Sequence, residues 1–369
     1  MKKLKLILKI LLGLAATLAV VVYFVFQMPQ FGGAMTGARL DRVQHSPEYS
    51  MGRFENKPPQ IKGMQLLKTI GLYNQGQVRE PSFEIPVMSL DSQTFLRTPD
   101  LGLSTIWFGH STVLVEIGGV RILTDPILSQ FASPFEIGPQ RFHPPPIDLR
   151  DLSGVDVVVI SHDHYDHLDM ATVQQLAAKG THFYVPLGIG AHLEKWQIKP
   201  DQIHEMEWWQ TAEFRGIKIH CTPARHYSGR KRQNNPTLWA SWFVQSEKNS
   251  FYFSGDTGYA EHFTEIKNKL GSPDMTLMKV GAYGEVESWL DIHMSPESAV
   301  QAQLDLGSST LLPIHWATFN LSYHAWDEPV LRTLAAATDK NIKVITPRIG
   351  EKFEFGKPFL NVEWYKGIQ

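Results

Sequence analysis

Hydrophobic and polar positions divide this chain into an apolar N-terminal run and a long remainder of shorter elements. Residues 10–26 form an uncharged, mostly apolar run of seventeen residues. Four lysines precede it: Lys2, Lys3, Lys5 and Lys9. Counted from Leu6, with the Lys9 amine reaching back toward water, the run approaches the ~20 residues that a helix needs to cross a bilayer. We predict a transmembrane anchor over residues 1–27.

A cleaved signal peptide has the same order of charged and apolar residues and is the alternative to an anchor. Such a peptide usually has a shorter apolar core that ends at small residues, whereas this run ends in Tyr23, Phe24, Val25 and Phe26. Lysine-rich flanks remain on the cytoplasmic side of a membrane. The anchor therefore predicts a single-pass protein with a cytoplasmic N-terminus and an extracytoplasmic remainder, which in a bacterium lies in the periplasm.

The remaining residues divide into an extension and one domain. Residues 28–79 are rich in Gly, Pro, Asn and Gln, and we predict a linker with an irregular extension over the domain surface. Residues 80–369 are enough for one domain. Within it, short β-rich runs are followed by helical patterns at 259–270, 296–306 and 328–339. This mixture predicts an α/β (α+β) fold of four layers, an αββα sandwich with two sheets face to face and helices outside.

Residues 161–169, SHDHYDHLD, carry four potential metal ligands within six positions. They are His162, His164, Asp166 and His167. The apolar run 155–160 just before them predicts a buried strand, so the ligands would lie on the loop at its carboxyl end. Histidines two residues apart can share one metal while Asp166 and His167 turn toward a second. The spacing predicts a two-metal hydrolytic site.

Three further candidate ligands each follow a strand-like segment. They are His226 after residues 217–222, Asp256 after 251–254, and His315 after 311–314. Imidazole and carboxylate donors suit Zn(II), and Fe and Mn accept the same donors. A surface loop that is histidine-rich by chance would not explain these additional positions.

These motifs resemble those of metallo-β-lactamase-fold hydrolases, most closely the branch that contains N-acylphosphatidylethanolamine-hydrolysing phospholipase D and its bacterial relatives. Further segments carry the resemblance: WFGHST at 107–112, TDP at 124–126, SGDTGY at 254–259, VGAY at 280–283, HMSPE at 293–297 and IHWATF at 314–319. The similarity covers roughly residues 80 to 360. It implies the four-layer sandwich and a metal-dependent hydrolase.

The resemblance also implies how the ligands are shared. One metal would be held by His162, His164 and His226, and a second by Asp166, His167 and His315, with Asp256 bridging both. Two Zn(II) ions per chain are the expected cofactors, with Fe or Mn as alternatives. Paired metals clamp the attacking and leaving oxygens, and water bound to them loses its proton near neutral pH. A hydroxide held by the two metals is the expected nucleophile.

Two residues outside the ligand set are predicted to orient ligands. Asp125 follows the strand-like residues 120–124 and would accept the second N–H of a ligand histidine. An Asp-Pro turn is compatible with that role. His110 would act in the same way, or would be an ordinary hydrogen-bonded histidine in a strand bend.

Three residues are predicted to take part in catalysis by resemblance, namely Asp125, Asp166 and His293. His293 lies just before a Ser-Pro-Glu sequence that is typical of a helix start. It would donate a proton to the leaving oxygen or contact phosphate. The alternative is a histidine whose hydrogen bonds are satisfied beside the helix cap and which takes no part in catalysis.

Tyr165, Arg230 and Asn320 are the predicted substrate contacts. Tyr165 lies between metal ligands and by resemblance touches the polar part of a lipid, and a side chain that only fills space is the alternative. Arg230 begins a basic cluster with Lys231 and Arg232, and guanidinium groups match phosphate oxygens. A solvated loop would carry the same charges. Asn320 lies in the aromatic-rich segment 316–323.

The overall composition adds little to this picture. The chain has 35 Lys and Arg residues against 37 Asp and Glu residues, which gives no basic footprint, so no nucleic-acid partner is expected. Cys221 is the only cysteine, which excludes an internal disulfide, and its strand-like surroundings predict a buried thiol. A homodimer is implied by the resemblance alone.

We therefore predict a membrane-anchored zinc phosphodiesterase acting on a phospholipid of the bilayer. The substrate would be N-acylphosphatidylethanolamine or a similar glycerophospholipid, and the products phosphatidic acid and an N-acylethanolamine. A lactonase or β-lactam hydrolase is the first alternative, because the same nucleophile can attack a carbonyl carbon. A non-catalytic, metal-holding membrane protein is the second.

Overall fold

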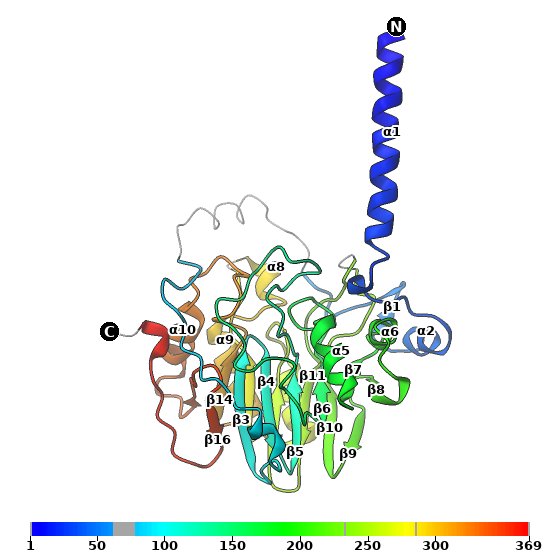
Figure 1. Ribbon diagram of the computed structural model, residues 1–369. Helices are drawn as coiled ribbons and strands as arrows, with labels where there is room; N and C mark the ends of the chain where they lie inside the picture. Colours follow the sequence, from blue (N-terminus) through cyan, green and yellow to red (C-terminus); the bar gives the residue numbers. More distant parts are fainter. Residues whose placement is uncertain (1, 62–77, 232–233, 285, 368–369) are drawn as a thin grey trace.

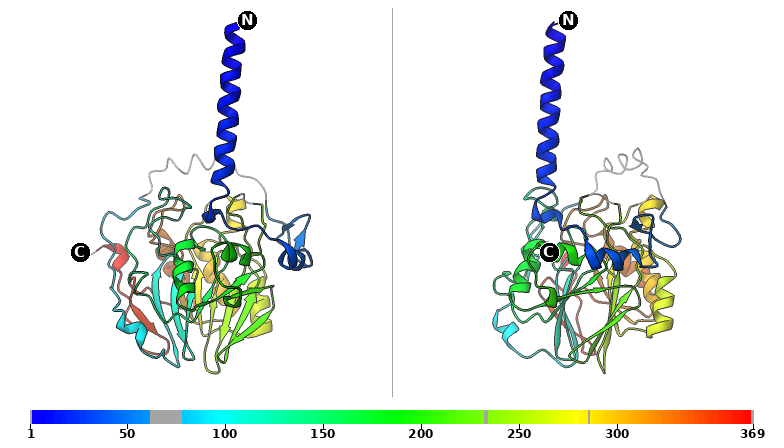
Figure 2. Two further views of the ribbon diagram at one scale, coloured as in Figure 1. Left: turned by 45° about the vertical axis from the view of Figure 1, so that its right-hand side comes forward. Right: turned by 90° about the vertical axis from the view of Figure 1, so that its right-hand side faces the viewer.

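Two β-sheets packed face to face form the centre of the molecule, and one long helix stands clear of them (Figures 1 and 2). The structure is a computed structural model that describes residues 2–61, 78–231, 234–284 and 286–367. Helices cover the outer faces of the sheets, so the layers run helix, sheet, sheet, helix. The predicted αββα sandwich is confirmed.

The first sheet contains both the beginning of the domain and a strand from near its end. Its order is β16 (Lys352–Glu354), β3 (Leu103–Gly109), β4 (Thr112–Ile117), β5 (Val120–Thr124), β6 (Val157–Val159), β7 (His182–Pro186) and β8 (Ile203–Met206). Strands β5 to β8 run parallel, and the pairs on the other side of β5 are antiparallel.

The second sheet is built from the later part of the chain. Its order is β15 (Lys343–Val344), β14 (Thr310–Ile314), β13 (Met275–Lys279), β12 (Ser250–Phe253), β11 (Ser241–Gln245), β10 (Ile217–Thr222) and β9 (Thr211–Phe214). Strands β12 to β15 are parallel, and β9 to β12 are antiparallel.

Side chains alternate between two hydrophobic layers along the strands of the first sheet. In β6, Val157 and Val159 join the core between the sheets, whereas Val158 joins the core beneath the outer helices. Leu114 and Val115 of β4 divide in the same way, because successive side chains of a strand point to opposite faces. All strand residues of β3 to β6 are buried, as expected for a sheet covered on both faces.

Helices close both outer faces. Within the described residues they are α1 (Lys2–Val25), α2 (Gly37–Gln44), α4 (Gln93–Leu96), α5 (Met170–Ala178), α6 (Gly190–Lys195), α7 (His262–Leu270), α8 (Glu287–Leu290), α9 (Pro296–Leu306) and α10 (Glu328–Ala337). Short 3₁₀ turns lie at η1 (Pro29–Phe31), η2 (Pro200–Gln202) and η3 (Trp364–Lys366). Helices α5 and α6 pack on the first sheet, while α9 packs on β13 between α7 and α10.

Several element boundaries agree with the hydrophobic pattern. The segments predicted at 120–124, 217–222 and 296–306 are β5, β10 and α9 at the same residues. Helix α7 begins at His262 rather than at residue 259. Helix α9 begins as its sequence indicates, since the Ser295 hydroxyl accepts a hydrogen bond from the Ser298 N–H and Pro296 follows as the first helical residue.

Residues 28–61, the described part of the extension, contain more regular structure than we predicted. Helix α2 and the hairpin of β1 (Tyr49–Ser50) and β2 (Arg53–Phe54) lie on the domain surface. Val43 and Phe54 are completely buried in a small core with Trp239. The predicted Gly- and Pro-rich linker therefore packs as part of the globular body.

Helix α1 carries the apolar run identified in the sequence. Residues 3–25 are long and apolar enough to cross a membrane, and none of them is buried against the rest of the protein. A signal sequence has the same length and composition, so the helix is either an anchor or a signal.

Candidate metal centre and active site

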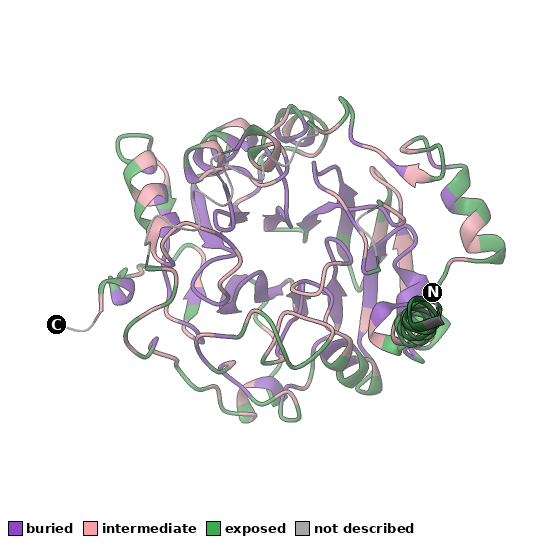
Figure 3. Ribbon diagram, turned by 90° about the horizontal axis from the view of Figure 1, so that it is seen from above, coloured by how far each residue is buried: buried purple, intermediate pink, exposed green. Residues whose placement is uncertain are grey.

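A candidate site residue follows each of six strands at one edge of the sandwich. His110 follows β3, Asp125 follows β5, His162 follows β6, His226 follows β10, Asp256 follows β12 and His315 follows β14. Parallel strands bring their carboxyl ends to a shared edge, and in α/β folds ligands bind there. Figure 3 shows this edge from above, with buried strands on both sides of the centre.

Three imidazole nitrogens meet at a first point on this edge. Nε2 of His162 lies 2.8 Å from Nδ1 of His164, and Nε2 of His226 lies 3.4 Å from the same Nδ1. The three ligand atoms all lie within 4.8 Å of one another. This is the set that the resemblance assigns to the first metal.

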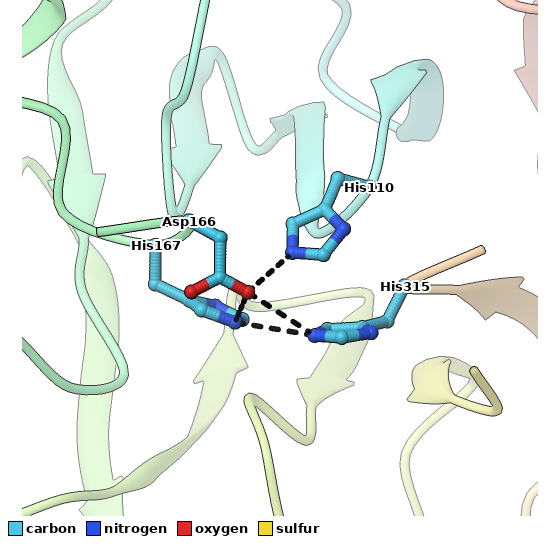
Figure 4. A group of neighbouring side chains, drawn as sticks. All are labelled: His110, Asp166, His167 and His315. Atoms are coloured by element: carbon cyan, nitrogen blue, oxygen red, sulfur yellow. Dashed lines mark hydrogen bonds and ion pairs between the residues drawn. The ribbon is translucent and has the colours of Figure 1, made fainter. Parts of the chain in front are cut away.

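A second group gathers four side chains from separate parts of the chain (Figure 4). Oδ2 of Asp166 lies 3.1 Å from Nε2 of His110 and 3.2 Å from Nε2 of His167. Nε2 of His315 lies 3.3 Å from Nε2 of His167 and 3.7 Å from the same carboxylate oxygen. The second predicted set, Asp166, His167 and His315, is thus brought together, and His110 joins it.

Asp256 lies between the two groups. Its Oδ1 is 3.1 Å from Nε2 of His315, and its Oδ2 is 3.4 Å from Nε2 of His167. On the other side, the same Oδ2 is 3.9 Å from Nε2 of His226. One carboxylate therefore faces both groups, which is the position that a bridging ligand requires.

The second nitrogen of each of three histidines is held by a protein oxygen. Nδ1 of His167 donates to Oδ2 of Asp125 at 2.7 Å, and Nδ1 of His226 donates to the Ile292 carbonyl at 3.1 Å. Nδ1 of His162 lies 2.8 Å from the Ser161 hydroxyl, which also hydrogen-bonds to Asp125. Because these contacts fix the ring orientation, the Nε2 atoms of His167 and His226 point to the centre.

These donors fit a pair of divalent cations. Burial lowers the pKa of His226 to about 3 and also lowers the pKa of His162 well below its usual value, so both rings are neutral near pH 7. At the second point, the charges of Asp166 and Asp256 outweigh burial and raise the pKa of His167, so this point attracts positive charge. Nitrogen and oxygen donors of this kind suit zinc, iron or manganese.

The backbone adopts an uncommon conformation at three of the residues that follow the strands. His110, Asp125 and His315 have positive φ angles of 51°, 30° and 67°. Residues with a side chain rarely adopt this region, and each such residue costs of order 1–3 kcal/mol. The surrounding hydrogen bonds and packing hold these side chains in place, because all three are buried.

An open cavity of about 1010 Å³ leads to the centre. His164, Asp166, Asp256, His293 and His315 lie on its floor, and its walls include Ile61, Tyr165, Tyr227, Trp289 and Tyr323. Aromatic and aliphatic walls above polar groups are typical of a site that binds an amphiphilic ligand.

His293 lines this cavity beside Asp256. Its Nδ1 lies 3.6 Å from Oδ2 of Asp256 and makes no hydrogen bond within the described residues. Burial, together with the nearby Lys279 charge, lowers the pKa of His293 well below its usual value. The ring is therefore neutral near pH 7.

The predicted substrate contacts have different surroundings. Tyr165 lines the cavity, and its hydroxyl donates to the Arg230 carbonyl at 2.7 Å. The Arg230 guanidinium is buried and donates to the carbonyls of Gln30, Asp163 and Leu168, so protein atoms engage the group that we predicted for phosphate. Arg230 and Lys231 both line the cavity, whereas Arg232 lies outside the described residues.

Asn320 belongs to a different hollow of the surface. Its side-chain amide donates to Glu80 at 3.1 Å, and it lines two other cavities, with Arg141 in one and Trp326 in the other. It is not among the residues that line the cavity above the metal centre. Its role as a substrate contact stays a prediction.

Two buried charged residues beside the site were missed in the sequence. Lys279, at the end of β13, is completely buried, and burial lowers its pKa to about 7 against the attraction of Asp256. The signal was a single lysine in the apolar run TLMKV. Asp163 stands between His162 and His164, and its buried carboxylate accepts the Gly229 N–H at 2.7 Å. It thereby ties the loop of His162 to the loop that follows His226.

Comparisons with known proteins show the family to which the chain belongs. Residues 120–316 match the family model of the "Beta-lactamase superfamily domain". An uncharacterised protein of Mycobacterium tuberculosis is 44% identical over 333 residues, 88% of each chain. N-acyl-phosphatidylethanolamine-hydrolyzing phospholipase D 1 of Caenorhabditis elegans is 34% identical over 288 residues, 73% of this chain and 80% of the nematode protein.

A solved structure shares the fold. Igni18, a metallo hydrolase of the archaeon Ignicoccus hospitalis, has 25% sequence identity and a TM-score of 0.53. The similarity covers 69% of this chain and 99% of the archaeal chain.

Proposed function

Because the chain belongs to the beta-lactamase superfamily of metal-dependent hydrolases, we propose that it cleaves the phosphodiester of N-acylphosphatidylethanolamine or a similar glycerophospholipid. The products would be phosphatidic acid and an N-acylethanolamine. The observation that carries the proposal is the joint arrangement of two donor groups, a shared Asp256 and an aromatic cavity above them. The 34% identity to a phospholipase D of this substrate class supports the choice of ester.

The proposed ligands divide as the resemblance implies. His162, His164 and His226 would hold one cation, Asp166, His167 and His315 a second, and Asp256 would bridge them. When bound, two divalent cations supply an activated water molecule and charge stabilisation for the phosphate. We propose Zn(II), because the donor set is dominated by imidazole.

The protein's own side chains would orient both the proposed metal ligands and the substrate. Asp125 holds the His167 ring by its Nδ1–H, and His110 holds the Asp166 carboxylate at 3.1 Å. Neutral His293 is placed to donate a hydrogen bond to a phosphate oxygen. The walls formed by Tyr165, Trp289 and their neighbours would exclude water from the acyl part of the lipid.

Location in a membrane completes the proposal. Helix α1 would serve as an uncleaved anchor, with the lysine-rich end in the cytoplasm and the domain on the other side. A substrate that resides in the bilayer would then be available to the cavity at high local concentration.

The direct test is product analysis by mass spectrometry. The full chain, purified in detergent and loaded with zinc, is mixed with N-acylphosphatidylethanolamine, and a chelator-treated sample and an Asp256→Asn variant serve as controls. We expect phosphatidic acid from the loaded protein alone. Absence of phosphatidic acid from a protein that contains two zinc ions would overturn the lipid substrate. Turnover of a lactone or β-lactam by that same sample would favour attack on carbon.

A further inference from the structure

The segment that leaves helix α1 is fastened to the domain at once. We call residues 27–31 the stem. The Lys195 amine donates to the Gln27 carbonyl at 3.0 Å, and the Trp196 indole donates to the Pro29 carbonyl at 2.7 Å. Just beyond the stem, the Ala191 carbonyl leaves no space for a side chain at Gly33. Since α1 ends at Val25, the first contact with the domain comes only two residues later, at Gln27.

The stem also adjoins residues 161–169, the loop that carries His162, His164, Asp166 and His167, which we call the metal loop. Arg230 donates through Nε to the Gln30 carbonyl at 3.0 Å, and through Nη1 to the carbonyls of Asp163 at 2.8 Å and Leu168 at 2.9 Å. Phe31 of the stem is buried, and its ring lies 6.4 Å from that of Tyr165, on the cavity wall. The stem, which follows helix α1 directly, therefore packs against residues of the cavity wall.

Exposed apolar side chains lie in or next to segments that line the cavity. We call five of them the rim: Met28, Ile61, Phe135, Ile137 and Leu290. Ile137, the most exposed, is 68% accessible, and Phe135 packs its ring 5.8 Å from Phe31 of the stem. Across the cavity, Leu290 ends helix α8, and Ile61 is held by a hydrogen bond from its N–H to Asp291. Figure 1 shows α1 rising from the end that carries α8.

We propose that a lipid bilayer, the one that α1 crosses, covers this rim, so that the cavity opens directly at the depth of the lipid headgroups. Two residues of extended chain span at most about 7 Å, so the end of α1 cannot be far from the domain surface. The helix is long enough for the ~30 Å hydrocarbon layer, which places its end at the membrane surface. Exposed apolar side chains grouped near a cavity indicate a surface with a partner, and the connection of this surface to a helix able to cross a membrane favours lipid as that partner. The proposal rests on α1 as an anchor and not on the chemistry of the substrate.

Fluorescence quenching by lipid tests this contact in the full chain. A bimane label is attached at Ile137→Cys or, on the other side of the cavity, at Leu290→Cys. The native Cys221 is completely buried and does not compete. Leu101→Cys is the matched control, because Leu101 is 72% exposed beside the β4–β5 turn at the opposite end of the sandwich.

Each labelled protein is inserted into phosphatidylcholine vesicles with or without brominated acyl chains. We expect brominated lipid to reduce the emission of the rim labels by at least two-fold and to leave the Leu101 label unchanged. Equal emission of the rim labels in both lipids would overturn the proposal. This outcome is also expected if a second copy of the chain, and not lipid, covers the rim. Equal quenching at all three positions would also overturn it. The readout needs no turnover, so failure of the proposed phosphodiesterase activity would leave it intact.

Discussion

Nδ1 of His167 lies 2.7 Å from Oδ2 of Asp125, and both side chains are completely buried. The carboxylate fixes the ring so that Nε2 faces the second donor group. It also accepts hydrogen bonds from the Ser161 amide and hydroxyl, so it connects β5 to the loop that carries the ligands.

Replacing this carboxylate tests whether it positions a ligand. Asp125→Asn should weaken metal binding by about 10- to 100-fold, because the amide holds the His167 ring and its N–H less strongly. Competition with a chelator measures the change. Asp148→Asn, at an exposed carboxylate, should bind metal as the native protein does. Native affinity in Asp125→Asn would show that the buried contact does not orient the ligand.

Asp256 should be needed by both donor groups at once. Asp256→Asn removes the negative charge that faces His167, His226 and His315, so metal content and hydrolysis should fall together. Metal analysis by mass spectrometry on the purified variant gives the content per chain. A variant with both metals and full activity would rule out the bridging role.

His293 should affect turnover without affecting metal content. His293→Ala removes a neutral hydrogen-bond donor from the cavity, and a loss of about 100-fold in kcat is expected of a residue that assists the transition state. His45→Ala, at an exposed histidine, is the control. If the alanine variant instead loses a metal, His293 is a ligand, as its proximity to His226 and Asp256 also permits.

A variant of Arg230 distinguishes a structural role of this residue from a role in binding phosphate. The structure engages its guanidinium with three backbone carbonyls, so Arg230→Met should lower the melting temperature and weaken metal binding, because it leaves those carbonyls without a donor. The KM for a short-chain substrate should change little once the protein is saturated with zinc. A large rise in KM with unchanged stability would instead support the contact between Arg230 and phosphate that the sequence suggested.

Glu116 should make stability depend on pH. Its carboxylate lies 2.9 Å from Nε of Arg121 and 3.0 Å from the Lys352 amine, and these cations outweigh burial and lower its pKa. Because the folded pKa is below the unfolded value, this stabilisation is present above the unfolded pKa and is lost as the pH falls through the folded one. Glu116→Gln should cost about 3 kcal/mol at pH 7, because it leaves the buried Arg121 unpaired.

Denaturant unfolding across the acid range measures this effect. The difference between native protein and Glu116→Gln should shrink as the pH falls below about 4, the ordinary range of a glutamate. The exposed pair of Lys366 and Glu363 provides the control, and Glu363→Gln should cost less than about 1 kcal/mol at any pH. A difference that does not change with pH would refute the role of the carboxylate charge.

Much of the site could be predicted from the sequence because ligand types and strand ends are local features. The spacing of His162, His164, Asp166 and His167 is visible in nine letters, and the resemblance supplied the pairing with Asp256 and His315. The orientation of a long side chain is not local. Arg230 was assigned to phosphate by its charge, whereas its acceptors come from Gln30 and from the metal loop, far away in the sequence.

The fold was predictable for a similar reason. The part of it that we predicted less well, the extension after helix α1, has a physical cause. Alternating apolar residues identify strands and helices, but Gly and Pro in residues 28–61 indicated an irregular segment. That segment gains helix α2 and a hairpin because Val43 and Phe54 bury themselves against Trp239 of the domain. A single sequence does not reveal which surface will receive such scattered apolar residues.

The left-handed backbone at His110, Asp125 and His315 has a consequence for evolution. Each residue opposes stability by of order 1–3 kcal/mol, which is a noticeable part of the ~5–15 kcal/mol that keeps a typical domain folded. Glycine would adopt the same angles without this cost, so the side chains at these three positions, and not the backbone conformation, account for the residues found there. In a lineage that abandons hydrolysis, these corners of the chain should therefore be among the first to change, before the strands that support them.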